Sequence, residues 1–203
     1  MAKQTGKFYV LEGIDGAGAA TQLRMLCNKL EDMGQACERL SYPDPGGPIG
    51  RLIYEYLDKK HDFPVETQFM LYSGDMLKDS VKIRSWLNAG KIVVSSRYIT
   101  STLAWQSAQG FPLEKAMRIV SSLDIPKPDA IIYLKISHQT SVHRKFRDKG
   151  ALDRNESNEK LLETVNKKYV YLSRKKALGK WITIDGEQSK EAVLQEIVSK
   201  LKL

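Results

Sequence analysis

The sequence predicts an α/β fold in which helices cover both faces of a five-stranded parallel sheet. Five short apolar segments of strand length alternate with longer segments of helical periodicity along the 203 residues, and this alternation is typical of parallel sheets. Most of the short segments are apolar at consecutive positions, which indicates strands that are buried on both faces. Because neither a repeat nor a linker interrupts the alternation, we expect one domain over residues 1–203.

The elements of the first half follow from apolar runs, helical spacing and glycine stops. Residues 8–12 form an apolar run that ends in a glycine-rich turn, which predicts a strand and a loop. The apolar residues that follow have the i, i+3, i+4, i+7 spacing of one helical face: Leu23, Leu26, Cys27 and Leu30. Gly34 is the expected stop of that helix. The other elements expected here are a strand at 36–42, a helix at 48–57 and one long helical stretch at 64–88.

The second half continues the same alternation. Gly90 closes the long helical stretch, and a run of apolar residues follows it at once. The strands expected in this half are 91–95, 130–136 and 181–185. The expected helices are 101–108, 113–123, 138–149, 158–178 and 189–201.

The composition excludes several classes of protein. With 42% hydrophobic residues in regular spacing, the chain is not disordered as its main state. No run approaches the roughly 18 apolar residues of a membrane-spanning helix, and the first residues are too polar for a signal peptide. Cys27 and Cys37 alone are no disulfide framework, so we expect reduced thiols in a cytoplasmic protein. The histidines lack ligand spacing, so we assign no metal-ligating residue.

The positive charge of the chain is concentrated in one region. The formal net charge is +8, and residues 135–180 hold 13 Lys and Arg against 5 Asp and Glu, which accounts for all of it. Such a concentration indicates either a polyanionic partner or an ordinary solvated helix surface. The region has no aromatic stacking pattern, so nucleic acid is an unlikely partner and a small polyphosphate is the better interpretation.

A glycine-rich loop joins the first strand to the first helix. Gly13 and Gly18 have the spacing of the motif G-x-x-x-x-G-K-[ST], in which backbone N–H groups at a helix N-terminus hold phosphates. Ala19 stands at the position of the lysine in that motif, and Ala20 at that of the hydroxyl that binds Mg²⁺. Taken alone, the loop is either a phosphate-binding loop without two of its side chains or a structural turn.

Several other segments decide between these alternatives. Together with the loop they resemble the thymidylate kinase family of P-loop nucleoside monophosphate kinases, in order and in approximate spacing. The similar segments are 8–18, 42–50, 72–75, 93–98, 101–106, 128–134, 153–156, Tyr169 and 181–185. The resemblance covers nearly the whole chain. It implies a P-loop NTPase-type three-layer fold with a mobile lid at about 144–157.

The resemblance also implies the reaction and the binding partners. Members of this family transfer the γ-phosphoryl group of ATP, bound with Mg²⁺, to dTMP and so form dTDP for dTTP biosynthesis. Phosphoryl transfer depends mostly on positioning and on neutralising the charge of the moving group. ATP, Mg²⁺ and dTMP are therefore the expected small molecules, and a homodimer is the expected assembly.

Each residue at a matching position receives a role from the resemblance. The ATP phosphates would be bound at Gly13, Gly16, Ala17, Gly18, Ala19, Ala20 and Thr21. The acceptor would be bound by Asp15, Tyr72, Arg97, Ser101, Thr102, Trp105 and Gln106. Tyr72 would stack on the base, and Trp105 would crowd the 2′ carbon and so favour deoxyribose. The catalytic residues would be Asp15, Arg97, Arg144, Arg147 and Arg154, the last three closing over ATP.

The departures from the family pattern fall on charged and metal-binding positions. The replaced positions are Ala19, Ala20, Pro45, Met76, Ser96 and Lys135. Losing one preorganised donor typically costs about 10²–10³ in rate, so the sequence predicts weakened activity. Arg24 and Arg51 are the cations considered as substitutes, but we do not expect either to reach the phosphates. Thr21 would point about 100° away from position 20 and is a poor replacement ligand. The two alanines could be engineered, but the other replacements favour natural divergence.

Three functions are consistent with this pattern. The first is a thymidylate kinase-like phosphotransferase with weakened activity, which would form ADP only with dTMP and magnesium. The second is a catalytically inactive nucleotide-binding protein with a regulatory or partner role, because the glycines remain while the lysine and hydroxyl are missing. The third, nucleic-acid binding through residues 135–180, ranks last.

Overall fold

The computed structural model describes residues 6–149, 154–155 and 158–203, except for the side chains of residues 145–149. In this described part, five parallel strands form one sheet in the order β2-β3-β1-β4-β5. The strands are β1 (Lys7–Glu12), β2 (Cys37–Ser41), β3 (Ile92–Ser96), β4 (Ala130–Lys135) and β5 (Trp181–Asp185). The expected parallel sheet is thereby confirmed, and each strand lies within a residue or so of its expected position.

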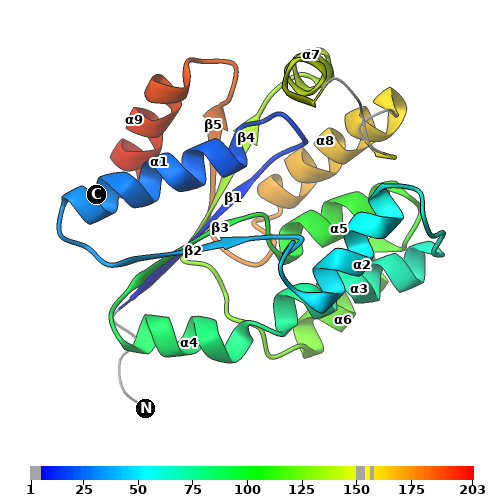
Figure 1. Cartoon of the computed structure of the whole chain (residues 1–203), viewed down its shortest axis with the longest axis horizontal. Coiled ribbons are helices and arrows are strands. Elements are labelled where there is room, and N and C mark those ends of the chain that lie inside the picture. Colours follow the sequence, from blue (N-terminus) through cyan, green and yellow to red (C-terminus); the bar gives the residue numbers. More distant parts are fainter. Residues whose placement is uncertain (1–5, 150–153, 156–157) are drawn as a thin grey trace.

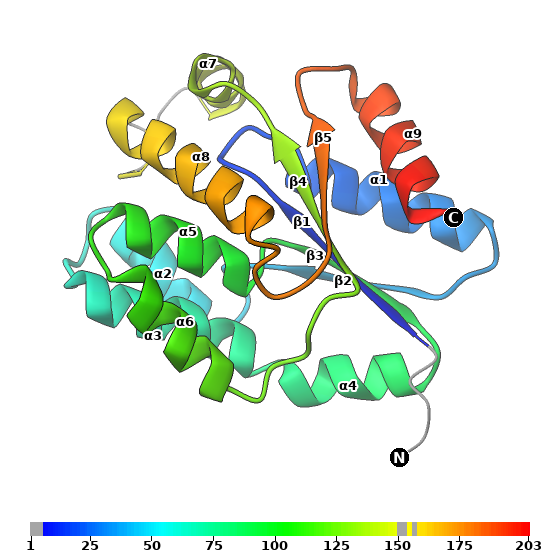
Figure 2. The same ribbon diagram turned by 180° about the vertical axis from the view of Figure 1, so that it is seen from behind.

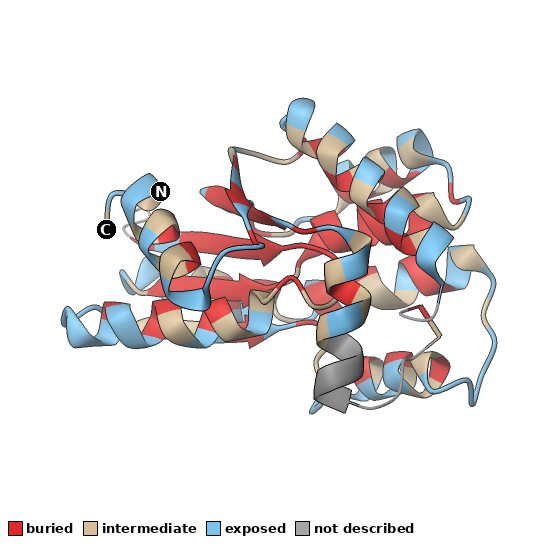
Figure 3. Cartoon of the chain, turned by 90° about the horizontal axis from the view of Figure 1, so that it is seen from above, coloured by how far each residue is buried: buried red, intermediate tan, exposed pale blue. Residues whose placement is uncertain are grey.

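Helices flank this sheet on both sides (Figures 1 and 2). The helices are α1 (Ala19–Asp32), α2 (Pro48–Leu57), α3 (Val65–Leu77), α4 (Ser80–Asn88), α5 (Ile99–Ala108), α6 (Leu113–Ser122), α7 (His138–Lys149), α8 (Glu159–Arg174) and α9 (Lys190–Leu201). Helices α1 and α9 lie together on one face, while α5 and α8 lie together on the other. The central strands β1, β3 and β4 are almost wholly buried (Figure 3), which explains their unbroken apolar character. The edge strands β2 and β5 are partly exposed.

The order of the strands places the candidate site. The chain leaves β1 to build β2 and β3 on one side of it, and then β4 and β5 on the other. In open parallel sheets, such a reversal leaves a crevice at the carboxyl ends of the strands. The glycine-rich loop after Glu12 and the residue Arg97 after β3 both lie at this edge.

The prediction of one long helix at 64–88 is wrong, because the structure contains two helices there. Helix α3 ends at Leu77 and α4 begins at Ser80. Between them, the carboxylate of Asp79 accepts hydrogen bonds from the Tyr42 hydroxyl at 3.0 Å and from Lys78 Nζ at 2.8 Å. The hydrogen bond from Tyr42 connects this turn to the segment after β2. The helix therefore breaks where a tertiary contact forms, and helical periodicity in the sequence does not reveal such a contact.

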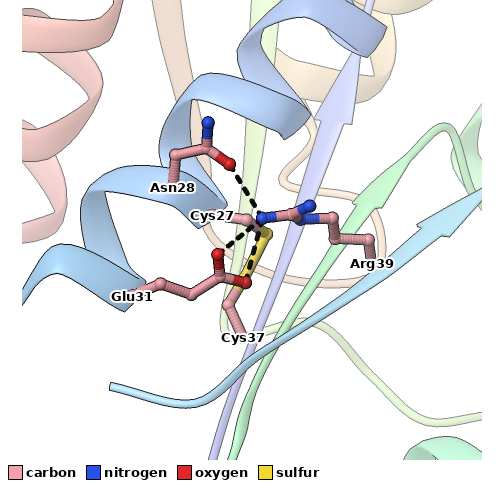
Figure 4. Close-up of a disulfide and its surroundings, with 5 residues drawn as sticks. All are labelled: Cys27, Asn28, Glu31, Cys37 and Arg39. Carbon is pink, nitrogen blue, oxygen red and sulfur yellow. Dashed lines mark hydrogen bonds and ion pairs between the residues drawn. A yellow bond between two sulfur atoms is a disulfide. The ribbon is translucent and has the colours of Figure 1, made fainter. Parts of the chain in front are cut away.

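The expectation of two reduced thiols is also wrong, because Cys27 and Cys37 form a disulfide (Figure 4). Cys27 lies on the buried face of α1, as expected, and Cys37 begins β2 directly after the chain turns back. Their Cα atoms are 5.5 Å apart, within the usual range for a disulfide. Arg39 joins the same two elements through Glu31, at 2.8 Å. The helical position of Cys27 could be read from the sequence, but its proximity to Cys37 could not.

Two further expectations concern the lid and membranes. The lid expected at about 144–157 lies only partly within the described residues, since residues 150–153 and 156–157 are outside them. A search of the described helices found none with the length and apolar character needed to cross a membrane.

Candidate functional site

A cavity of 520 Å³ lies at the carboxyl edge of the sheet, where the glycine-rich loop meets α5. Most of the residues that the sequence assigned to the site line it. They are Asp15, Gly16, Ala17, Gly18, Ala19, Ala20, Thr21, Tyr72, Arg97, Ser101, Thr102, Trp105, Gln106 and Arg144. Gly13 and Arg154 are not among the lining residues, and the side chain of Arg147 is outside the described part of the chain.

The glycine-rich loop is shaped by close packing beneath it. A Cβ atom at Gly13 would lie 2.8 Å from the carbonyl oxygen of Leu134 in β4, so only glycine fits. Gly18, the residue before α1, has a φ of 94°, and because it is a glycine it has no side chain that could cap the helix. The N–H groups of the first turn of α1 have no partner within the helix, and this turn lines the cavity. The loop can therefore bind an anion through its backbone.

Helix α7 holds the loop from the opposite side. Ser141 Oγ donates to the carbonyl oxygen of Asp15 at 2.5 Å. Arg144 donates from Nη1 to the carbonyl oxygen of Gly16 at 3.2 Å and from Nη2 to that of Gly186 at 3.0 Å. Arg144 therefore connects the loop to the segment after β5, and its cationic head lies at the phosphate-binding end of the cavity.

Arg97 and Asp15 form an ion pair in the middle of the site. Arg97 Nη2 lies 2.7 Å from Asp15 Oδ1, and Nη1 donates to the carbonyl oxygen of Gly13 at 3.1 Å. Burial alone would lower the pKa of Arg97, but the charges of Asp15, Tyr169 and Glu12 more than offset it, and the pKa is raised. Arg97 also has a φ of 67°, an uncommon conformation for a residue other than glycine.

Glu12, which the sequence analysis did not single out, is completely buried next to this pair. Its carboxylate accepts hydrogen bonds from the backbone N–H groups of Tyr98 and Ser101, both at 3.1 Å, at the start of α5. It also accepts from the hydroxyls of Thr100, Ser101 and Tyr169, the last at 2.9 Å. Glu12 thus fixes the carboxyl end of β1 against the N-terminus of α5, where a negative charge is favourable.

The environment of Glu12 predicts a pH-dependent stability. Burial raises its pKa above the ordinary value of 4.5, and the hydrogen bonds from Ser101 and Thr100 oppose this shift only in part. The unfolded chain therefore releases this proton at a lower pH than the folded protein, and folding becomes less favourable as the pH rises through that range. We expect the free energy of unfolding of the wild type to fall relative to that of Glu12→Gln as the pH rises above the ordinary pKa of 4.5.

Chemical denaturation of both proteins across this pH range measures the effect. Tyr169→Phe is the second variant, because it removes one hydrogen bond to the carboxylate and should raise the pKa of Glu12 further, so that stability falls over a wider pH range than in the wild type. If the free energy of unfolding changed with pH in the same way for the wild type and for Glu12→Gln, this would contradict the expectation.

The other end of the cavity has neutral side chains. Thr102 Oγ1 lies 3.9 Å from the sulfur of Met76, in the wall formed by α3 and α5. The buried atoms Trp105 Nε1 and Gln106 Oε1 have no hydrogen-bond partner among the described residues. They provide one donor and one acceptor in a wall that is otherwise suited to a planar apolar ring. The Ser101 hydroxyl also lines the cavity and is hydrogen-bonded to Glu12 and Tyr169.

Arg154 lies away from the glycine-rich loop. Its guanidinium donates to the carbonyl oxygens of Tyr56 and His61, both at 3.1 Å, and lies 2.6 Å from the carboxylate of Asp62. It also covers the ring of Tyr56 at 4.7 Å. These contacts anchor Arg154 to the end of α2, so the structure brings Arg144 to the loop but does not bring Arg154 there.

The positions that depart from the family pattern also have distinct places. Ala19, Ala20, Met76 and Ser96 line the cavity, so the replaced groups would have faced the ligand. Pro45 and Lys135 are exposed and do not line it. Neither Arg24 nor Arg51, the two cations considered as substitutes, is among the lining residues. Lys190, at the start of α9, does line the cavity, but no local sequence pattern marks it.

Comparisons with known proteins agree with this geometry. A family model described as thymidylate kinase matches residues 11–197. The chain is 30% identical over 199 residues to the human thymidylate kinase, covering 97% of this chain and 90% of that protein. It is 32% identical over 210 residues to the thymidylate kinase of a Synechococcus strain, covering 98% of each. A solved structure of thymidylate kinase from Candida albicans superposes with a TM-score of 0.78, at 25% identity, over 98% of this chain and 93% of that one.

The match extends over nearly all of the sheet and over the glycine-rich loop and α5, which line the cavity. The strand order, the glycine-rich loop before α1 and the Asp15–Arg97 pair lie within the matched residues. This chain belongs to the thymidylate kinase family.

Proposed function

We propose that this protein is a thymidylate kinase-like phosphotransferase, which transfers the γ-phosphoryl group of ATP to dTMP with weakened activity. The observation that carries the proposal is the continuous cavity from the glycine-rich loop, through the Asp15–Arg97 pair, to the neutral pocket beside Trp105. An anion site and a ring-binding site joined by a cation suit a donor triphosphate and an acceptor nucleotide.

Different parts of the cavity would bind different parts of the two substrates. The backbone of the loop and the first turn of α1 would bind the donor phosphates. Arg97, held by Asp15, lies between the loop and the pocket and would bind the acceptor phosphate. Tyr72 and Trp105 would enclose the acceptor's base and sugar. Because Glu12 fixes β1 against α5, the loop and the pocket keep one relative position, which phosphoryl transfer needs.

The family implies that Mg²⁺ accompanies ATP, but the residues present do not fit it well. Ala20 occupies the position of the usual hydroxyl ligand. Asp15 is the one carboxylate among the described lining residues, and it is bound to Arg97. Together with Ala19, which lacks the charge of the loop lysine, these replacements are why we propose weakened activity.

The alternative is a nucleotide-binding protein without catalysis, which the two alanines in the cavity favour. A coupled assay for ADP formation, run with and without dTMP in magnesium buffer, tests the proposed function. Turnover that depends on dTMP supports it. Nucleotide binding by calorimetry without any such turnover at high enzyme concentration would instead establish the catalytically inactive alternative.

We further propose that the chain forms a homodimer in the cytoplasm and that residues 1–203 act as one domain. Large apolar side chains are exposed on two successive helices, with Met70 on α3 58% exposed and Val81 on α4 78% exposed. Exposed apolar surface of this kind is typical of an interface. We expect sedimentation equilibrium to give the mass of a dimer and Val81→Asp to shift it toward the monomer. Lys82→Asp is the matched control on the same helix, and a monomeric wild type would refute the dimer.

A further inference from the structure

The charges around the loop indicate which form of the triphosphate this protein binds. The described lining residues include three cations, Arg97, Arg144 and Lys190, and one carboxylate, Asp15. The carboxylate lies 2.7 Å from the guanidinium of Arg97, so the pair is nearly neutral together. No carboxylate among the described lining residues is left to pair with Arg144. Lys190 lies 3.7 Å from the exposed carboxylate of Glu191, a surface pair outside the cavity lining, and such a pair is weak. The phosphate end of the described cavity is therefore positive. The following inference rests on the proposed function, because it concerns the same site.

The second carboxylate near the loop is not available to a ligand. Glu12 immediately precedes Gly13, but it does not line the cavity, and its side chain is completely buried. Its carboxylate accepts five hydrogen bonds from the described residues, two from backbone N–H groups and three from hydroxyls. A cation could bind there only by displacing these donors from a closed, buried site.

The neutral oxygen groups of the cavity do not replace a carboxylate. Thr21, Ser41 and Ser96 line it with hydroxyls, and Ala20 lacks the one hydroxyl that the loop motif places at the metal. Mg²⁺ requires nearly octahedral oxygen ligands and is usually held through one or two carboxylates together with phosphates and water. The donor set described here therefore suits an anion and not a divalent cation.

We propose that this protein binds nucleoside triphosphate in its metal-free form, with Arg144 and Lys190 neutralising the phosphates. The metal-free triphosphate carries more negative charge than its Mg²⁺ complex, so a positive cavity without metal ligands binds it more strongly. Arg144 is held in place for this role, because two of its N–H groups are fixed on the carbonyl oxygens of Gly16 and Gly186 while other donors remain.

Calorimetric titration of the full chain with ATP, in EDTA and again in excess MgCl₂ at matched ionic strength, tests this inference. We expect the wild type to bind ATP about threefold or more tightly in EDTA. The variant Ala20→Thr restores the motif's hydroxyl and is expected to reverse the order, so that Mg²⁺ tightens binding. Ala20→Val, which has the same shape without the hydroxyl, is the matched control and should still bind ATP more tightly in EDTA than in MgCl₂.

The outcomes separate this inference from the proposed function. Wild-type binding that Mg²⁺ tightens about tenfold or more would overturn the inference, while the nucleotide site and the proposed function would stand. Equal effects of Ala20→Thr and Ala20→Val would also overturn it, because the metal would then not respond to the hydroxyl. If ATP binds in neither condition, the proposed function fails together with the inference.

Discussion

The double substitution Ala19→Lys, Ala20→Thr is expected to raise kcat/KM for dTMP-dependent ADP formation by about 10²–10³. Both alanines line the cavity at the first turn of α1, so the new ammonium and hydroxyl would face the donor phosphates. The rest of the arrangement is present, because the loop, the Asp15–Arg97 pair and the Glu12 contacts are formed without them. A coupled assay in saturating ATP and MgCl₂, with dTMP varied, measures the change.

The control for this experiment is Ala19→Met, Ala20→Val, which adds similar bulk without the charge or the hydroxyl. It should leave kcat/KM at the wild-type level. An increase of less than about threefold in Ala19→Lys, Ala20→Thr would refute the expectation. In that event the neutral wall at Met76 and Ser96 limits the reaction as well, since both residues line the same cavity.

The second large effect is expected from Arg144→Met, which should weaken ATP binding about tenfold or more. The variant loses the cation at the loop and also the two hydrogen bonds that join Gly16 to Gly186. Calorimetry with ATP in EDTA measures the affinity, and thermal denaturation without nucleotide confirms that the variant is folded.

Arg154→Met is the matched comparison, because the sequence assigned both arginines to the same lid. Arg154 bonds to carbonyl oxygens at the end of α2 and pairs with Asp62. We therefore expect its ATP affinity to stay within about twofold of the wild type while the free energy of unfolding falls by about 1–2 kcal/mol. Equal losses of ATP affinity in the two variants would show that both arginines act on the phosphates.

The part of the site that could be predicted from sequence is the part built from contiguous segments. Gly16, Gly18 and Thr21 belong to one loop whose spacing is a recognisable motif, and the structure places them in the cavity. Ser101 and Trp105 were equally recognisable from one helix. The sequence analysis missed Glu12 and Lys190. Glu12 accepts hydrogen bonds from residues far along the chain, and Lys190 reaches the cavity only through the packing of α9. A single residue at a strand end or a helix start gives no local signal in the sequence.

Arg154 shows that a segment can be recognised from the sequence while the contacts of its side chain cannot. Its segment was found from the sequence, yet the atoms that it contacts were not, because a long flexible side chain can reach either a phosphate or the end of another helix. The same limit applies to Cys27 and Cys37. The helical position of Cys27 follows from apolar spacing, but the return of β2 to the same place depends on the packing of α1 against the sheet.

The sequence by itself determined the alternation of strands and helices, the parallel sheet and the loop at the carboxyl end of β1. These features follow from apolar periodicity and from the spacing of the glycines in one loop, which are local properties. Only the tertiary structure decided that Glu12 is enclosed by donors, that Arg144 and not Arg154 reaches the loop, and that the phosphate end of the described cavity is positive. The physical reason is that burial and charge pairing depend on groups brought together from distant parts of the chain, and these contacts exist only after the sheet has formed.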